Sequence, residues 1–236
     1  MTTQAKRWEF VPCSEINVDG HILRRIRALV DMPGHDVKAG DIGGYVENEK
    51  NLPQDSRAWV YDNARVYGSA RVYGKACVCG EAQVYDNAQV YDNAQVYGEA
   101  RVSSCAQVYD NAQVYGEALV SGEARVYHRA QVYDNAQVYG EALVSSCACV
   151  SGDAVICDSA DWIYVGPSAS SRRFTTAHRD AELGVRVNCG CFSGSLAEFA
   201  AAIEKTHQNR PQDLARYRAF HRLIMDVFGN ENTNDK

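Results

Sequence analysis

The sequence lacks a long hydrophobic run and a secretion signal. Its most apolar early stretch, His21 to Val30, contains Arg24, Arg25 and Arg27, and the first ten residues do not follow the charged-then-apolar order of a signal peptide. These absences argue against export and against a membrane-spanning helix. We therefore expect a cytoplasmic protein without a membrane partner.

Cysteine pairs with metal-type spacing are also missing. The nine cysteines are odd in number and include no C-x2-C pair, so we expect free thiols in a reducing compartment. The 236 residues include 46% apolar and 23% charged side chains, which is enough to bury a core. The net charge of −6 argues against strong nonspecific binding to nucleic acid.

A six-residue repeat dominates the centre of the sequence. Alanine recurs at every sixth residue from Ala58 to Ala160, which gives 17 hexads over residues 58–159 of the form A-x-V-Y-[DG]-[NES], with Ile156 the only exception to valine. Successive side chains of a strand point to opposite faces. Alanine and valine therefore point inward, the x residue and tyrosine point outward, and the following dipeptide turns the chain.

The hexad V-Y-D-N-A-Q resembles the I-G-D-N-[STV]-x repeat of the left-handed parallel β-helix family, best known from acyltransferases. The resemblance implies triangular coils of about 18 residues that each rise ~4.8 Å, and it implies the left-handed sense. We expect a mainly β fold with a single-stranded left-handed parallel β-helix of about six coils over residues 58–161. A tyrosine stands where the family usually has a small or acidic residue, which gives an aromatic surface.

Residues 1–57 predict a β cap that leads into the helix. His21 to Val30 has the apolar content of a strand, Pro33-Gly34 marks a turn, and Val46 and Leu52 share the six-residue phase of Ala58, which predicts a degenerate first coil over residues 40–57. The motif GDIGGYVENEKNL at residues 40–52 resembles bacteriophage and prophage proteins without an established activity, as does GCFSG at residues 190–194. The resemblance implies a phage or prophage protein in the host cytoplasm.

Residues 162–236 predict a second cap, with a hairpin followed by two helices. Two short strands are expected in residues 172–189 around Leu183-Gly184. A capping box at Ser195 and Glu198 predicts the start of one helix, and Pro211 the start of the next. Cys189 and Cys191 flank a glycine, and we interpret this segment as a tight turn; a nucleophile or metal ligand is the alternative.

Aligning the repeat every 18 residues gives three outward columns, which we call the first, second and third faces. The first holds Tyr61, Cys79, Tyr97, Tyr115, Tyr133 and Ser151; the second holds Tyr67, Tyr85, Ser103, Ser121, Tyr139 and Cys157; the third holds Tyr73, Tyr91, Tyr109, Tyr127 and Ser145. The tyrosines are either simple stacking ladders or a partner surface, because tyrosine is enriched in interfaces. As interface candidates we take Tyr73, Tyr91, Tyr109 and Tyr127, followed by Tyr97, Tyr115 and Tyr133.

Two charged groups are further candidates. The turn after the first face carries an acidic ladder, which is either solvated or binds a cation or basic partner: Asp62, Glu81, Glu99, Glu117, Asp134 and Asp153. Arginines gather on the last predicted helix, where they either face solvent or contact a phosphate-bearing ligand: Arg210, Arg216, Arg218 and Arg222.

Enzymes with this repeat need histidines, as a general base or as zinc ligands. The hexads contain only His128, at a turn, and no loop insertion. The pairs Cys77/Cys79 and Cys147/Cys149 point outward but lie four coils apart, so they do not form one metal site. We expect no enzyme activity, no metal and no cofactor.

The sequence thus favours a non-enzymatic scaffold that binds a host or phage protein, as a homotrimer, and inhibits or sequesters a host factor such as a defence component. The trimer and the phage setting come from the resemblance. A hexapeptide acyltransferase and a binder of small anionic or nucleotide ligands through the arginine-rich tail remain the alternatives.

Overall fold

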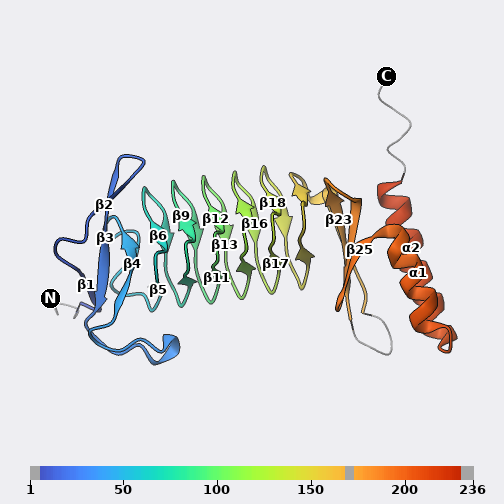
Figure 1. Cartoon of the computed structure of the whole chain (residues 1–236), viewed down its shortest axis with the longest axis horizontal. Coiled ribbons are helices and arrows are strands. Elements are labelled where there is room, and N and C mark those ends of the chain that lie inside the picture. The colour runs from blue at the N-terminus through green and yellow to red at the C-terminus, as the bar shows by residue number, and fades with distance from the viewer. Residues whose placement is uncertain (1–5, 168–172, 230–236) are drawn as a thin grey trace, which may run out of the picture.

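The structure, a computed structural model, describes residues 6–167 and 173–229 and has the form of a rod. Figure 1 shows coils stacked along the long axis, with strands β1–β4 at one end and helices α1 and α2 at the other. Each of the 17 hexads contributes one two-residue strand. These strands are β5 (Trp59–Val60), β6 (Arg65–Val66), β7 (Arg71–Val72), β8 (Cys77–Val78), β9 (Gln83–Val84), β10 (Gln89–Val90), β11 (Gln95–Val96), β12 (Arg101–Val102), β13 (Gln107–Val108), β14 (Gln113–Val114), β15 (Leu119–Val120), β16 (Arg125–Val126), β17 (Gln131–Val132), β18 (Gln137–Val138), β19 (Leu143–Val144), β20 (Cys149–Val150) and β21 (Val155–Ile156).

The strands form three parallel sheets, one beneath each predicted face. The first sheet contains β5, β8, β11, β14, β17 and β20, the second runs from β4 through β6, β9, β12, β15 and β18 to β21, and the third contains β7, β10, β13, β16 and β19. Partners in neighbouring coils differ by 18 residues, as in Val90 and Val108. The predicted parallel β-helix of about six coils is confirmed.

The interior consists of the alanine and valine columns. Every alanine from Ala64 to Ala154 and every valine from Val60 to Val150 is fully buried, as is Ile156. A narrow interior accepts these small side chains at close packing. The series ends at Ala160, which is exposed and lies in the 3-10 helix η2 (Ser159–Asp161).

The N-terminal cap consists of β1 (Trp8–Phe10), β2 (Ile16–Val18), β3 (His21–Ala28) and β4 (Ile42–Val46), with the short 3-10 helix η1 (Pro33–His35) between β3 and β4. Antiparallel pairing of β3 with β4 extends the second sheet, and β4 then pairs in parallel with β6. The predicted strand in residues 21–30 and the turn at Pro33-Gly34 are confirmed.

The phase of the first coil differs from the prediction. The six-residue phase places Val46 opposite Ala64, but β4 pairs Val46 with Val66, so this coil is two residues longer than the others. The extra length lies in the segment after β4, which leaves the regular path while Leu52 stays fully buried. A sequence phase alone cannot show such an insertion, because it assumes a constant coil length.

The C-terminal cap is a four-stranded antiparallel sheet with two helices. Its elements are β22 (Trp162–Val165), β23 (Thr175–Asp180), β24 (Gly184–Cys189), β25 (Phe192–Ser195), α1 (Leu196–His207) and α2 (Pro211–Phe228). The predicted hairpin corresponds to β23 and β24, whereas β22 and β25 were not predicted; residue 172 lies outside the described residues. The capping box is confirmed, because Ser195 Oγ accepts from Glu198 N while Glu198 accepts from Ser195 N.

Candidate binding surfaces

The outward tyrosines form ladders of parallel rings. On the third face, ring centroids lie 4.9 Å apart for Tyr73 and Tyr91, 5.0 Å for Tyr91 and Tyr109, and 5.1 Å for Tyr109 and Tyr127, with planes within 5° of parallel. Tyr97, Tyr115 and Tyr133 stack in the same way on the first face, at 4.8 and 4.9 Å. The predicted columns are therefore confirmed as stacking ladders.

Glutamines in the neighbouring column tie one coil to the next. Tyr73 Oη donates to Gln89 Oε1 at 3.2 Å, and Tyr91 Oη donates to Gln107 Oε1 at 3.5 Å. Partial burial, together with the adjacent phenols, raises the pKa of Tyr91 to about 12, so this phenol is uncharged near neutral pH. The third face is thus an ordered surface of apolar rings and amide groups, and the Arg71 guanidinium lies 5.4 Å from the centre of the Tyr73 ring.

The caps cover the faces unequally. The first face is contacted at both ends, where Tyr61 Oη donates to His35 O at 2.8 Å and His178 contacts the last coil. On the third face, Trp162 Nε1 of the C-terminal cap donates to Leu143 O in the last coil at 2.9 Å. Among the described residues, however, no hydrogen bond or ring contact joins the four tyrosines themselves to either cap. Its tyrosines remain partly exposed, so the longest ladder is also an accessible one.

The acidic ladder is divided between two turn positions. Asp62 and Asp134 stand at the first position, where their carboxylates accept the N–H groups of Gly80 and Gly152, one coil further on, at 3.1 Å. Glu81 and Asp153 stand at the second position and accept from asparagine side chains of the preceding coil, at 2.7 and 3.1 Å. Glu99 and Glu117 border a hollow of about 330 Å³ that also contains Arg101. Most of these carboxylates therefore link coils to one another.

Cysteine and histidine meet at one place that the sequence did not indicate. Cys77 Sγ lies 3.2 Å from His35 Nδ1, because the loop after β3 folds over the first face. Burial raises the pKa of Cys77 to about 11 and lowers that of His35, so the thiol stays protonated at neutral pH. All nine cysteines are free thiols, and among the described residues no three or more His, Cys, Asp or Glu side chains are placed to hold a metal ion.

His128 lies at an exposed turn with a φ of 59°, as predicted from its position in the repeat. Its ring lies 4.7 Å from that of Tyr127, and its backbone N–H donates to Asp110 Oδ2 at 3.1 Å. The imidazole therefore extends the edge of the third-face ladder.

The four candidate arginines, of which Arg210 precedes α2 as its N-cap and the other three lie within the helix, do not converge on one site. Arg218 forms two bonds of 2.7 Å with Glu204 of α1, and Arg210 lines a hollow of about 260 Å³ with Cys191 and His207. Arg216 and Arg222 are exposed. The cysteines of the tail flank Gly190, which has a φ of 62° in the turn between β24 and β25, so the predicted tight turn is confirmed.

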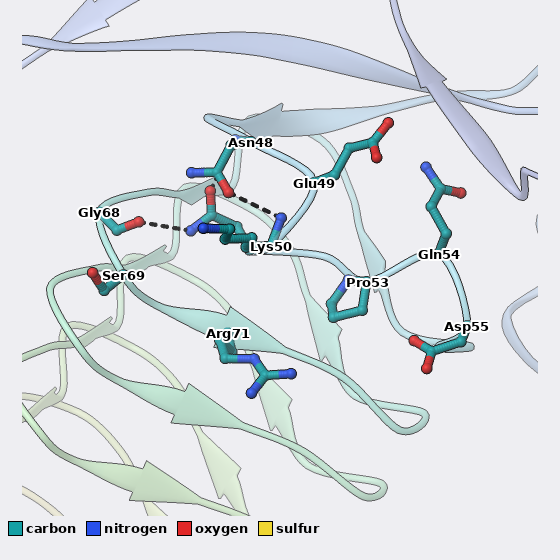
Figure 2. Close-up of a pocket in the computed structure, with 10 residues that line it drawn as sticks. Asn48, Glu49, Lys50, Pro53, Gln54, Asp55, Gly68, Ser69 and Arg71 are labelled. Atoms are coloured by element: carbon teal, nitrogen blue, oxygen red, sulfur yellow. Dashed lines mark hydrogen bonds between the residues drawn. The ribbon is translucent and has the colours of Figure 1, made fainter.

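A hollow beside the long first coil was not predicted. It measures about 700 Å³ and is lined by Asn48, Glu49, Lys50, Asn51, Pro53, Gln54, Asp55, Gly68, Ser69 and Arg71. Figure 2 shows Arg71 reaching outward between the loop that carries Pro53 and Asp55 and the turn that carries Ser69. The two additional residues create this hollow, because they displace the loop from the regular coil path.

The fold and its repeat define a β-solenoid repeat protein. Residues 58–79, 82–98, 106–122 and 130–146 match the family described as the YdcK beta solenoid repeat, and these four segments all lie within the rod. No curated protein shows significant sequence similarity to the chain. Within the described part of the chain, the helices are too short or too polar to cross a membrane.

Proposed function

We propose that this chain is a non-enzymatic scaffold that binds a protein partner through its third face. The observation that carries the proposal is the uninterrupted ladder of Tyr73, Tyr91, Tyr109 and Tyr127, stacked at 4.9–5.1 Å and joined to neither cap by a hydrogen bond or ring contact among the described residues. Tyrosine supplies rigid apolar area with a polar tip, which is typical of interface anchors.

Preorganisation supports this function. The strands beneath the ladder are held by their neighbours at an 18-residue register, and ring stacking restricts the tyrosine side chains before a partner arrives. Binding to such a surface costs little conformational entropy, since few side chains have to be ordered. A flat protein surface fits this face better than a small molecule, which requires a concave site.

Two further proposals rest on the sequence resemblance, namely a homotrimeric assembly and an origin in a phage or prophage. A place in the host cytoplasm and a host target such as a defence component are proposed in addition. In a trimer, the third face lies either between subunits or against that target. Both arrangements require the same tyrosines.

The test replaces Tyr91 and Tyr109 together by serine. Folding should survive, because Ser145 already occupies the same column, while loss of two aromatic anchors should weaken the interface by at least about a hundredfold. Light scattering would then report a smaller assembly than that of the parent. If the parent is a monomer, a pull-down with host lysate should lose a protein that the parent retains.

The matched control is Tyr85→Ser with Tyr139→Ser, which removes two rings from the second face, where Ser103 and Ser121 already stand. This control should keep the parent's assembly and partner. An unchanged assembly and an unchanged set of captured proteins in the third-face variant would refute the proposed surface and reduce the ladder to a stabilising element.

A further inference from the structure

Four cations line two adjoining hollows beside the first coil. Lys50 and Arg71 line the larger hollow, and Arg71 also lines the adjoining hollow of about 410 Å³ together with Arg57 and Lys75. Among the described residues, none of the four lies within 4.0 Å of a carboxylate. Two acidic side chains share the lining: Glu49, which Lys6 already contacts at 2.7 Å, and Asp55. Cations and carboxylates balance in the larger hollow alone, but the two hollows together carry four cations against two carboxylates, in a chain of net charge −6.

The wall of the hollow is rigid although it is irregular. Asn51 is fully buried, and its amide donates to Gly68 O at 3.0 Å and Ala70 O at 2.8 Å. Its Oδ1 accepts from Asn48 N at 2.9 Å, and Val72 N donates to Asn51 O at 2.8 Å. One buried asparagine thus joins the loop to the turn on the opposite side of the hollow.

A second clamp holds the outer part of the loop. Gln54 accepts from the N–H groups of Arg7 and Trp8 at 2.8 and 3.3 Å and donates to Trp8 O at 3.0 Å. The indole of Trp8 also donates to Leu52 O at 3.1 Å. The loop is therefore ordered by the N-terminal cap, and its cations stand at a preformed site.

We propose that this hollow binds the phosphate group of a small phosphorylated molecule. Arg71 offers a planar guanidinium that can hold two phosphate oxygens, and Lys50 supplies a second charge. The amide group of Asn48 and the hydroxyl of Ser69 line the same space. A volume of about 700 Å³ lies within the range of small-molecule sites and leaves room for an organic group beside the phosphate.

The position of Arg71 in its column provides a matched experiment. In the third sheet it pairs with Gln89, which pairs with Gln107, which pairs with Arg125. Arg71→Gln therefore introduces a residue that this column already uses, and folding should be unaffected. Arg125→Gln makes the same change three coils away, about 14 Å along the rod.

Inorganic phosphate and adenosine monophosphate serve as probes, in buffers matched for ionic strength with chloride. The parent and Arg125→Gln should show a rise in melting temperature and heat of binding with adenosine monophosphate, and a weaker response to phosphate. Arg71→Gln should lose at least about tenfold in affinity, and Lys50→Gln should weaken it as well. No response of the parent to either probe, or an equal response of the parent and Arg71→Gln, would overturn the proposal.

Discussion

The first residue of each turn between residues 62 and 152 has a positive φ. Glycine adopts this conformation without strain, and aspartate tolerates it better than most residues. Four aspartates also add a bond, because their Oδ2 accepts the N–H of the residue 18 positions later at 3.1–3.3 Å. These four pairs are Asp62 with Gly80, Asp86 with Ser104, Asp110 with His128, and Asp134 with Gly152.

Two substitutions of Asp86 separate the contribution of the side-chain hydrogen bond from that of the left-handed backbone conformation. Asp86→Ala removes the bond to Ser104 N and places an alanine at a φ of 57°, so it should lower the free energy of unfolding by about 2 kcal/mol. Asp86→Gly loses the same bond but relieves the backbone, and the loss should stay within about 1 kcal/mol. Urea unfolding measures both. Equal effects of the two substitutions would show that the backbone conformation is not limiting at this turn.

The acidic ladder shows what the residue pattern could and could not provide. Its column was predicted correctly, whereas its bonds between coils were not; the expected role, solvation or binding of a cation or a basic partner, stays a prediction. The bonds of Asp62 and Asp134 to the next coil depend on the side-chain direction at a left-handed turn residue, which hydrophobic periodicity does not encode.

At the scale of elements, the C-terminal sheet closes the open edge of the rod with polar contacts. Cys149 N donates to Thr176 Oγ1 at 3.1 Å, Ser151 N donates to His178 Nε2 at 3.3 Å, and Asn188 Nδ2 donates to Cys149 O at 2.9 Å. An open strand edge invites association with other chains. Here side chains of β23 and β24 form hydrogen bonds with the backbone groups to which a further coil would bond.

His178 makes the cap sensitive to pH. Its Nε2 accepts a hydrogen bond while Nδ1 donates to Arg179 O at 3.0 Å, so the ring is neutral. Burial lowers the pKa of His178 below 6.5, and the unfolded chain takes up the proton first. The free energy of unfolding is therefore highest above pH 6.5, and this contribution is lost as the pH falls below it, by up to about 1.4 kcal/mol per pH unit.

The measurement compares urea midpoints at pH 7.5 and 5.5 for the parent and His178→Gln. The variant should be less stable at pH 7.5 and should lose less on acidification. His35 also has a pKa lowered by burial and acts in the same direction from the N-terminal cap, so the variant isolates the part due to His178. An identical loss of stability on acidification in both proteins would show that groups other than His178 cause it.

The helices and the central hairpin of this cap were predictable because they carry local signals. The helices have the capping box at Ser195 and the proline at position 211, and the hairpin has its turn around Leu183-Gly184. The outer strands β22 and β25 were missed because each has only four residues and no alternating pattern. Their pairing depends on β23 and β24 beside them, which is a tertiary effect.

At the scale of the whole molecule, the rod is a linear stack in which each coil bonds only to its neighbours. The sequence predicts this architecture well, because every hexad repeats the same inward and outward pattern. The hollow beside the first coil was not predictable in the same way. It arises where the register changes from 18 to 20 residues, and only the pairing of β4 with β6 reveals that change.

The stack predicts that the rod can be shortened by one coil. Deleting residues 95–112 joins Ala94 to Gln113 and restores the local sequence A-Q-V-Y-G-E, with the 18-residue register and all three faces kept in line. A net stability of about 0.05–0.15 kcal/mol per residue implies a loss of about 1–3 kcal/mol, or ~2–10 °C in melting temperature. Circular dichroism should show the same spectral shape and one cooperative transition. An unfolded product would mean that the coil at residues 95–112 makes contacts beyond its nearest neighbours, because the deletion leaves both caps in place and joins two coils of the same repeat.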